Sequence, residues 1–172
     1  MIMRTIASAT LTALLAVNAA SAADTATTEA AAIVTSFGEA ISARQLDKAL
    51  AYFAPGSVQF SLRPAHTGLG GGQAPGLTAD LRGHWSTIMP VLFSATKSYS
   101  RTAEVIDSRV DGDIATVWAT ITTTTVRSDK PETKSDKFVE VYLLVHKDGQ
   151  WKIGGIADNR RPNDVGLGAA KP

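Results

Sequence analysis

The chain has 172 residues, no Cys, 44% hydrophobic residues and 19% charged residues, a composition typical of one folded domain. The absence of Cys excludes a disulfide framework and a cysteine-based zinc site. Lys and Arg number 17 against 16 Asp and Glu, and the sequence has no basic run. Nucleic acid is therefore not an expected partner.

The amino terminus has the three regions of a secretory signal peptide in the expected order. Met1 to Arg4 is a short positive start, Thr5 to Val17 is an uncharged apolar stretch, and Ala20 to Ala22 is a small-x-small cleavage site. A transmembrane anchor would need about 20 apolar residues, more than this run supplies. We therefore expect cleavage after Ala22, a periplasmic or secreted location, and no membrane attachment afterwards. Residues 1–22 are then the signal peptide, 23–163 the folded domain and 164–172 a flexible tail.

Two helices are expected at the start of the domain. From Thr27 to Arg44, apolar residues recur at steps of three and four and form one stripe, made of Ala31, Val34, Phe37 and Ile41. A shorter helix should follow and end at Pro55-Gly56, with one apolar face made of Leu46, Ala49, Leu50 and Phe53.

A strand, a loop and a third helix come next. Apolar and polar residues alternate from Val58 to Leu62, which predicts a strand. The segment from Pro64 to Gly76 is rich in Gly and Pro and lacks the Lys-Ser/Thr of a phosphate-binding loop, so we interpret it as a mobile flap. Helical spacing returns from Gly83 to Phe93, with Pro90 expected in the first turn or at a kink.

The second half of the domain predicts long strands joined by hairpins. Asp111-Gly112 and Asp148-Gly149 are two-residue turn signals, and a polar loop from Arg127 to Asp136 connects the two hairpins. Centring that loop near Glu132 gives two cross-strand rows, one of Glu104, Ala119, Val145 and Lys152, and one of Ser98, Thr125, Val139 and Asp158.

These rows predict two unlike faces of the sheet. The expected core face is aliphatic and carries Ile106, Ala115, Val117, Ala119, Ile121, Val139, Val141, Leu143, Val145 and Ile156. The expected outer face mixes aromatic and polar residues, namely Tyr99, Arg101, Trp118, Thr120, Thr122, Thr124, Glu140, Tyr142, His146 and Trp151. A slip of one residue would exchange the faces, so the assignment depends on the turns.

The order of elements resembles the nuclear transport factor two-like superfamily, in its SnoaL-like and ketosteroid isomerase-like branches. The residues that carry the resemblance are Tyr52 to Pro55 after two helices, Arg82-Gly83 at the third helix, and Asp148 to Ile153 in the last hairpin. The resemblance covers about Glu29 to Arg160. It implies an α+β fold, in which a cone-shaped, curved antiparallel sheet wraps around three helices and encloses an apolar pocket. It also implies a homodimer through the outer sheet face, where Trp118, Tyr142 and Trp151 are the expected contacts.

The resemblance makes Asp158 the first candidate for proton transfer. Ketosteroid isomerases carry their catalytic acid on the strand after the second helix, but Ser57 to Leu62 contains no carboxylate, which disfavours that mechanism. SnoaL-like cyclases carry an acid late in the sheet, and Asp158 matches that position. A buried carboxyl there would suit general acid or base work. The alternative is a strand-end acid that pairs with Arg160 or Arg161.

His84 is the second proton-transfer candidate, beside Trp85 at the start of the third helix; the alternative is a solvated helix-terminal His. Residues expected to line the pocket are Tyr52, Trp85, Thr123, Thr125 and His66, the last of these on the flap. Ordinary core packing or strand solvation would account for the same residues.

No cofactor or metal is expected, because the chain has neither a nucleotide fingerprint nor a spaced set of metal ligands. Two functions remain open. The first is an exported protein that binds a small apolar or carbonyl-containing molecule without catalysis. The second is a cofactor-free isomerase, dehydratase or cyclase that uses Asp158 as general acid or base.

Overall fold

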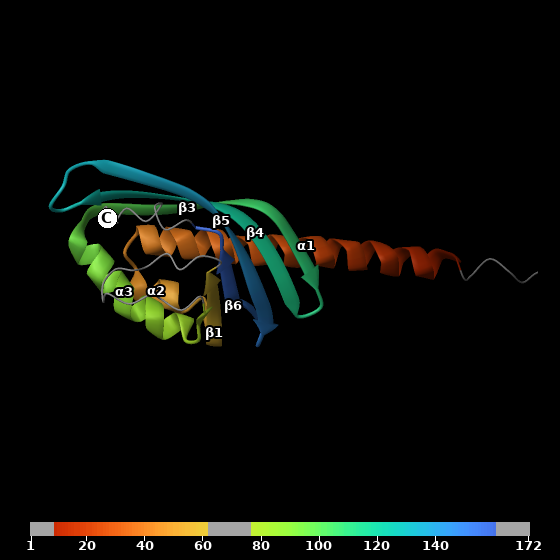
Figure 1. Ribbon diagram of the computed structural model, residues 1–172. Coiled ribbons are helices and arrows are strands. Elements are labelled where there is room, and N and C mark those ends of the chain that lie inside the picture. The colour runs from red at the N-terminus through yellow and green to blue at the C-terminus, as the bar shows by residue number, and fades with distance from the viewer. Residues whose placement is uncertain (1–8, 62–76, 161–172) are drawn as a thin grey trace, which may run out of the picture.

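The computed structural model describes residues 9–61 and 77–160, which form three helices and one sheet (Figure 1). The helices are α1 (Ala9–Ser42), α2 (Leu46–Leu50) and α3 (Leu81–Ala95). The strands are β1 (Phe53–Ser61), β2 (Leu77–Thr78), β3 (Thr96–Asp111), β4 (Ile114–Arg127), β5 (Thr133–Lys147) and β6 (Gln150–Asp158). The predicted α+β class and the three helices of the domain are confirmed.

The six strands form one unclosed sheet in the order β2-β1-β6-β5-β4-β3. The β1–β6 pair is parallel and the other neighbouring pairs are antiparallel. Figure 1 shows β3, β4 and β5 bending around the helices, with the far end of α1 projecting beyond the sheet. The helices therefore lie on the concave face of the sheet.

Helix α1 buries one stripe against the sheet, and Val34, Phe37 and Ile41 belong to it as predicted, whereas Ala31 is only half-buried. Its fully buried side chains are Ala30, Val34, Phe37, Ala40 and Ile41. The helix begins at Ala9, inside the segment expected to be a signal peptide. Among the described residues, no helix combines the length and apolar character that crossing a membrane requires.

The boundary between α2 and β1 differs from the prediction. Helix α2 ends at Leu50, and Phe53 starts β1 instead of belonging to the helix. Within β1 the apolar Val58 and Phe60 are 37% and 49% exposed, whereas Ser57 is buried. The alternation of β1 is therefore real, but its apolar side faces away from the core.

Helix α3 joins the core through an aromatic group that links three elements. Trp85 lies edge-on to Phe37 of α1, with ring centroids 5.2 Å apart, and Phe37 meets Phe53 of β1 at the same distance. Asp80 accepts a hydrogen bond from the backbone N–H of Gly83 at 2.9 Å and so caps the helix. Pro90 lies inside α3, beyond the first turn.

The predicted register between β4 and β5 is wrong by five residues. Ala119 pairs with Glu140, where the sequence analysis placed Val145. The loop between the strands runs from Ser128 to Glu132, so the pairing starts earlier than a centre at Glu132 implies. Because five is odd, the side chains of β5 exchange faces. The buried residues of β5 are Phe138, Glu140, Tyr142 and Leu144.

The β3–β4 pairing also differs, because β3 contains a bulge. The turn lies at Gly112, one residue later than predicted, and Asp111 pairs with Ile114. A register shift between Val105 and Asp107 then reverses the alternation along β3. Arg101 is consequently buried, and Ile106 is 60% exposed, both opposite to the prediction. The β4 face itself is correct, since Ala115, Val117, Ala119 and Ile121 are buried.

The β5–β6 turn is confirmed, and a second irregularity follows it. Lys147 pairs with Gln150 as predicted, and Asp148 and Gly149 both have positive φ, which two-residue hairpin turns require. The register then shifts at Gly154, so that Trp151 and Ile153 are buried before the shift and Ile156 after it.

These registers correct the residues expected at a dimer interface. Tyr142 is fully buried and Trp151 is 5% exposed, whereas Trp118 is 46% exposed. Tyr142 and Trp151 therefore belong to the core of one chain. Of the three expected contacts, only Trp118 remains on the convex face.

Ser42 ties α1 to β3 at the level of Arg101. Its hydroxyl accepts a hydrogen bond from the Arg101 backbone N–H at 2.7 Å and lies 3.0 Å from the Arg101 carbonyl oxygen. Helix α1 comes close here, since a Cβ on Gly38 would lie 3.1 Å from the same carbonyl oxygen.

Replacing Ser42 with Ala should destabilise the fold, because the Arg101 backbone N–H loses its partner. We expect a loss of about 1–3 kcal/mol in the free energy of unfolding, measured by urea denaturation. Ser36→Ala makes the same chemical change on the same helix and should cost less than about 0.5 kcal/mol. Equal losses in the two variants would contradict the role given to Ser42.

Candidate functional site

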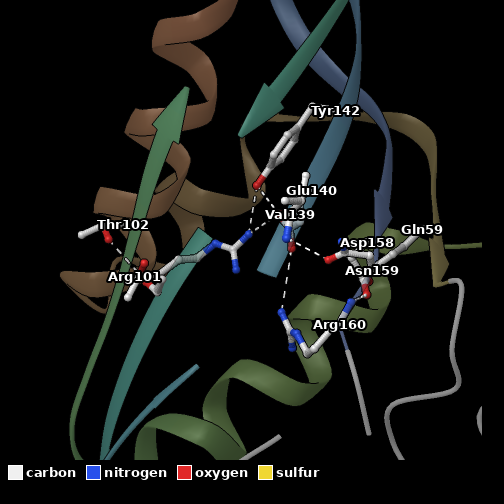
Figure 2. Close-up of polar contacts among 10 residues, drawn as sticks. Gln59, Arg101, Thr102, Val139, Glu140, Tyr142, Asp158, Asn159 and Arg160 are labelled. Carbon is white, nitrogen blue, oxygen red and sulfur yellow. Dashed lines mark hydrogen bonds and ion pairs between the residues drawn. The ribbon is translucent and has the colours of Figure 1, made fainter. Parts of the chain in front are cut away.

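A polar cluster lies inside the core on the concave face of the sheet (Figure 2). Arg101 comes from β3, and Glu140 and Tyr142 come from β5. The side chains of Arg101 and Glu140 are 1% and 2% exposed. The Arg101 guanidinium donates to the Glu140 carboxylate and, at 2.9 Å, to the Tyr142 hydroxyl. The Tyr142 hydroxyl in turn donates to the same carboxylate oxygen.

The electrostatics of the cluster keep the protons on Arg101 and Tyr142. Burial by itself would lower the pKa of Arg101, but the Glu140 carboxylate and Tyr142 raise it above its ordinary value. Burial, with the negative charge of Glu140, raises the pKa of Tyr142 even though Arg101 opposes the change. Arg101 therefore stays charged, and Tyr142 keeps the proton that it donates.

Arg160 brings a second guanidinium to the cluster. Its Nη2 atom lies 3.8 Å from Oε1 of Glu140, whereas Arg101 contacts Oε2. The guanidinium carbon stands 3.9 Å over the ring of Phe138, a cation–π arrangement. The Arg160 side chain is 21% exposed, so the cluster reaches the surface through this residue.

Asp158 is buried on the concave face beside Glu140, where the sequence predicted Val139 as its neighbour on β5. It is 4% exposed and pairs with Glu140 across the β5–β6 ladder. Gln59 of β1 donates to one carboxylate oxygen at 2.9 Å, and the Arg160 backbone N–H donates to the other at 3.1 Å. The two hydrogen bonds reach Asp158 from β1 and from the segment that follows β6, and all three residues are labelled in Figure 2.

The structure brings two predicted pocket residues to the same region. Thr123 is 7% exposed and pairs with Arg101. Trp85 is 8% exposed, and the Arg101 guanidinium carbon lies 5.8 Å from its ring centroid. Thr125, two residues further along β4, pairs with Tyr99 and is half-buried.

The remaining predicted residues have other positions. His84 is half-buried on α3, where its backbone N–H bonds the Asp80 carbonyl. Tyr52 lies between α2 and β1, partly buried against the core, and its carbonyl accepts from Ile153. His66 lies outside the described residues. Within the described ranges, no group of three or more His, Asp or Glu side chains could hold a metal ion.

Several buried polar atoms of this region have no hydrogen-bond partner among the described residues. Three are N–H donors, namely Nε1 of Trp85, Nε of Arg101 and Nε of Arg160. The fourth is the hydroxyl of Ser57. Buried donors without partners are rare in folded proteins, so this group marks where a bound polar atom would fit.

The sequence pattern does not single out Arg101, Glu140 and Tyr142 as site residues. It predicts correctly that the three share one face of the sheet, but it assigns them to the outer face, whereas they are buried. The signal in the sequence is the alternation of Phe138, Tyr142 and Leu144 along β5. This set is as apolar as the β5 residues that were assigned to the core face, namely Val139, Val141, Leu143 and Val145. Arg and Glu side chains are exposed in most proteins, so their charges favoured the outer face for this row, which is wrong.

Comparison with known proteins identifies the fold. No protein-family model matches the sequence, and no curated protein matches it. A nuclear transport factor 2-like superfamily protein from Salmonella enterica superposes with a TM-score of 0.59 at 18% identity, covering 85% of this chain and 99% of that one. The chain has the nuclear transport factor two-like fold. The resemblance found in the element order is thereby confirmed.

Two further structures of this fold are similar. A ketosteroid isomerase-like protein from Erwinia carotovora gives a TM-score of 0.61 at 12% identity, with 77% of this chain and 94% of that chain covered. A putative scytalone dehydratase from Novosphingobium aromaticivorans gives 0.58 at 12% identity, with 73% and 77% covered. Identities this low carry the fold alone.

Removing one partner of the buried Arg101–Glu140 ion pair should lower the free energy of unfolding. Glu140→Leu leaves the Arg101 charge buried without its close partner, and we expect a loss of about 3–5 kcal/mol in the free energy of unfolding. The double variant Arg101→Met/Glu140→Leu removes both charges and should recover most of that loss. Chemical denaturation of the two single variants and the double variant measures the coupling. Additive losses would contradict a direct pair.

His84 should make stability depend on pH. Burial lowers its pKa below the ordinary value of 6.5, so the unfolded chain takes up a proton before the folded chain does. The contribution of His84 is complete above pH 6.5 and is lost as the pH falls below it. His84→Gln should flatten this part of the denaturation profile, whereas Arg82→Gln, at an exposed neighbour, should not. Equal profiles for His84→Gln and the unchanged protein would refute the assignment.

Proposed function

We propose that this protein is exported after removal of residues 1–22 and binds a small apolar or carbonyl-containing molecule on the concave side of its sheet. The observation that carries the proposal is the group of buried N–H donors beside the apolar core. Aromatic rings from α1, α3 and β5 contact the guanidinium groups, with Phe37 and Trp85 near Arg101 and Phe138 near Arg160. An apolar site with a few convergent polar groups is the usual form of a small-molecule site.

Similar structures support binding of this kind without naming the molecule. One is described as a putative scytalone dehydratase and another as a putative aromatic ring hydroxylase. Such descriptions imply small cyclic molecules for those proteins. One fold hosts many activities, so the proposal for this chain rests on its own buried donors.

A second candidate function is cofactor-free isomerisation, dehydration or cyclisation with Asp158 as general acid or base. Burial of the Asp158 carboxyl and its contact with Gln59 favour this candidate. A general base must be held within reach of the proton it removes, and Gln59 fixes its orientation. Conversion of the bound molecule that stops in Asp158→Asn would establish catalysis. Binding without conversion leaves the first function.

Native mass spectrometry of protein purified from its source organism tests binding. We expect a retained small molecule, and lower occupancy in Thr123→Val, which removes a hydroxyl next to Arg101. The loss should be about fivefold, the effect of about 1 kcal/mol for one hydrogen bond. Thr122→Val is the matched control, because Thr122 lies on the opposite face of β4. Two results together would contradict the proposal: a native mass spectrum that shows only the chain without a bound molecule, and no rise in its melting temperature when an extract of the same cells is added.

We also propose that two chains pair through the convex face of the sheet. Large apolar side chains are exposed there on four strands, at Val58, Phe60, Leu77, Trp118 and Leu143. Val58 and Leu143 flank Gly155, and a Cβ built on Gly155 would lie within 4 Å of atoms of both residues. Exposed apolar surface that is continuous in this way is typical of an interface.

Sedimentation measures the pairing directly. The unchanged protein should sediment as a dimer at high micromolar concentration, and Trp118→Asp should weaken the dimer at least thirtyfold, since a central Trp contributes about 2 kcal/mol or more. Val91→Asp changes an apolar residue of α3 that is 43% exposed and should leave the dimer intact. A monomer at high concentration would remove this proposal.

A further inference from the structure

The three buried donors belong to one connected group. The guanidinium of Arg101 lies over the ring of Trp85, with 5.8 Å between its central carbon and the ring centroid. Arg101 and Arg160 contact different oxygens of Glu140. Figure 2 shows the two guanidinium groups reaching this carboxylate from separate elements. The side chains that carry the three donors are therefore linked through the Arg101–Trp85 contact and the shared carboxylate of Glu140.

The number of donors selects among oxygen groups. A ketone or aldehyde has one oxygen with two lone pairs, so it satisfies at most two of the donors on Trp85, Arg101 and Arg160. A carboxylate has two oxygens with about four acceptor positions, which is enough for all three. Two of the donors are on guanidinium groups, and hydrogen bonds from charged donors to a carboxylate are stronger than those to a neutral carbonyl.

Within the cluster, Arg160 is the cation nearest the surface. The guanidinium groups of Arg101 and Arg160 contact Glu140, and the buried carboxyl of Asp158 lies beside Glu140. The pair of Arg101 and Glu140 is closed within the core, whereas Arg160 lies farther from Glu140 and is partly exposed. Arg160 is thus the cation that an incoming acid meets first.

We propose that the bound molecule is a small apolar carboxylic acid, whose carboxylate accepts hydrogen bonds from Arg160, Trp85 and Arg101. Its apolar part packs against the core side of α3 and the sheet. This inference rests on the proposed function and narrows it from carbonyl-containing molecules to organic acids. Glu140 and Tyr142 then serve as positioning residues, because they hold the Arg101 guanidinium in place.

Calorimetric titration of the full chain with matched probes tests the inference. The pairs are benzoate with acetophenone and 2-naphthoate with 2-acetonaphthone, each sharing a ring system and differing in the oxygen group. We expect the acid of the better-fitting pair to bind at least tenfold more tightly than its ketone. Trp85→Phe and Arg160→Gln should each reduce that preference at least threefold, because each removes one of the three donors that the carboxylate can satisfy together.

The controls separate this inference from the proposed function. Arg127→Gln removes an arginine that pairs with Asp129 at the surface and should not change the preference. Arg160→Gln alters a partly exposed side chain, so it remains usable if Trp85→Phe does not fold. Equal binding of acid and ketone, or a preference unchanged in Arg160→Gln, overturns the inference and leaves the proposed function standing. Failure of all four probes, with no retained molecule in native mass spectrometry, overturns both.

Discussion

Two opposite charges, the Arg101 guanidinium and the Glu140 carboxylate, lie inside an apolar core with side chains 1% and 2% exposed. Removing ions from water costs several kcal/mol each, and the attraction between them offsets this only with good geometry and further hydrogen bonds. Tyr142 supplies such a bond on the same oxygen. The pair is therefore a constraint that the surrounding strands have to satisfy together.

That constraint connects elements that are distant in the sequence. Ser42 of α1 holds the Arg101 backbone, and Thr123 of β4 lies between the strands that carry Arg101 and Glu140. On the other side, Arg160 follows β6 and contacts the free oxygen of Glu140. A slip of one residue in β3 or β5 would leave one charge in the core and send the other to solvent. The ion pair consequently disfavours the neighbouring registers, because removing one partner from a buried pair costs about 3–5 kcal/mol.

The sequence predicts the elements of this fold better than their registers. Apolar spacing correctly located the stripe of α1, and Asp148-Gly149 correctly fixed the last turn. The predicted register of β5 was wrong because the polar loop from Arg127 to Asp136 has no residue that marks its centre. The predicted face of Arg101 was wrong because the irregularity between Val105 and Asp107 has no signature in the local sequence. Bulges follow from tertiary curvature, which a pattern along one strand does not contain.

The site was predicted in the same uneven way. Asp158, Thr123 and Trp85 lie in or beside the cluster. The predicted face of β4 and the predicted helix α3 are correct for Thr123 and Trp85, whereas Asp158 pairs with Glu140 instead of the predicted Val139. Arg101, Glu140 and Tyr142 were predicted to share a face, and they do, because the bulge in β3 and the register error in β5 each reversed the face of one strand. Their burial could not be inferred, since a lone sequence gives no reason to place an arginine and a glutamate in a core. The donors that support ligand binding therefore became visible only with the fold.

The position of Glu140 depends on the register of β4 against β5, which can be measured. In the folded, isotope-labelled protein, interstrand nuclear Overhauser effects between backbone protons report which residues are opposite each other. The buried cluster requires contacts between Ala119 and Glu140 and between Ile121 and Phe138. Contacts between Ala119 and Val145 would contradict it, since they would place Glu140 on the solvent side and remove the buried cluster.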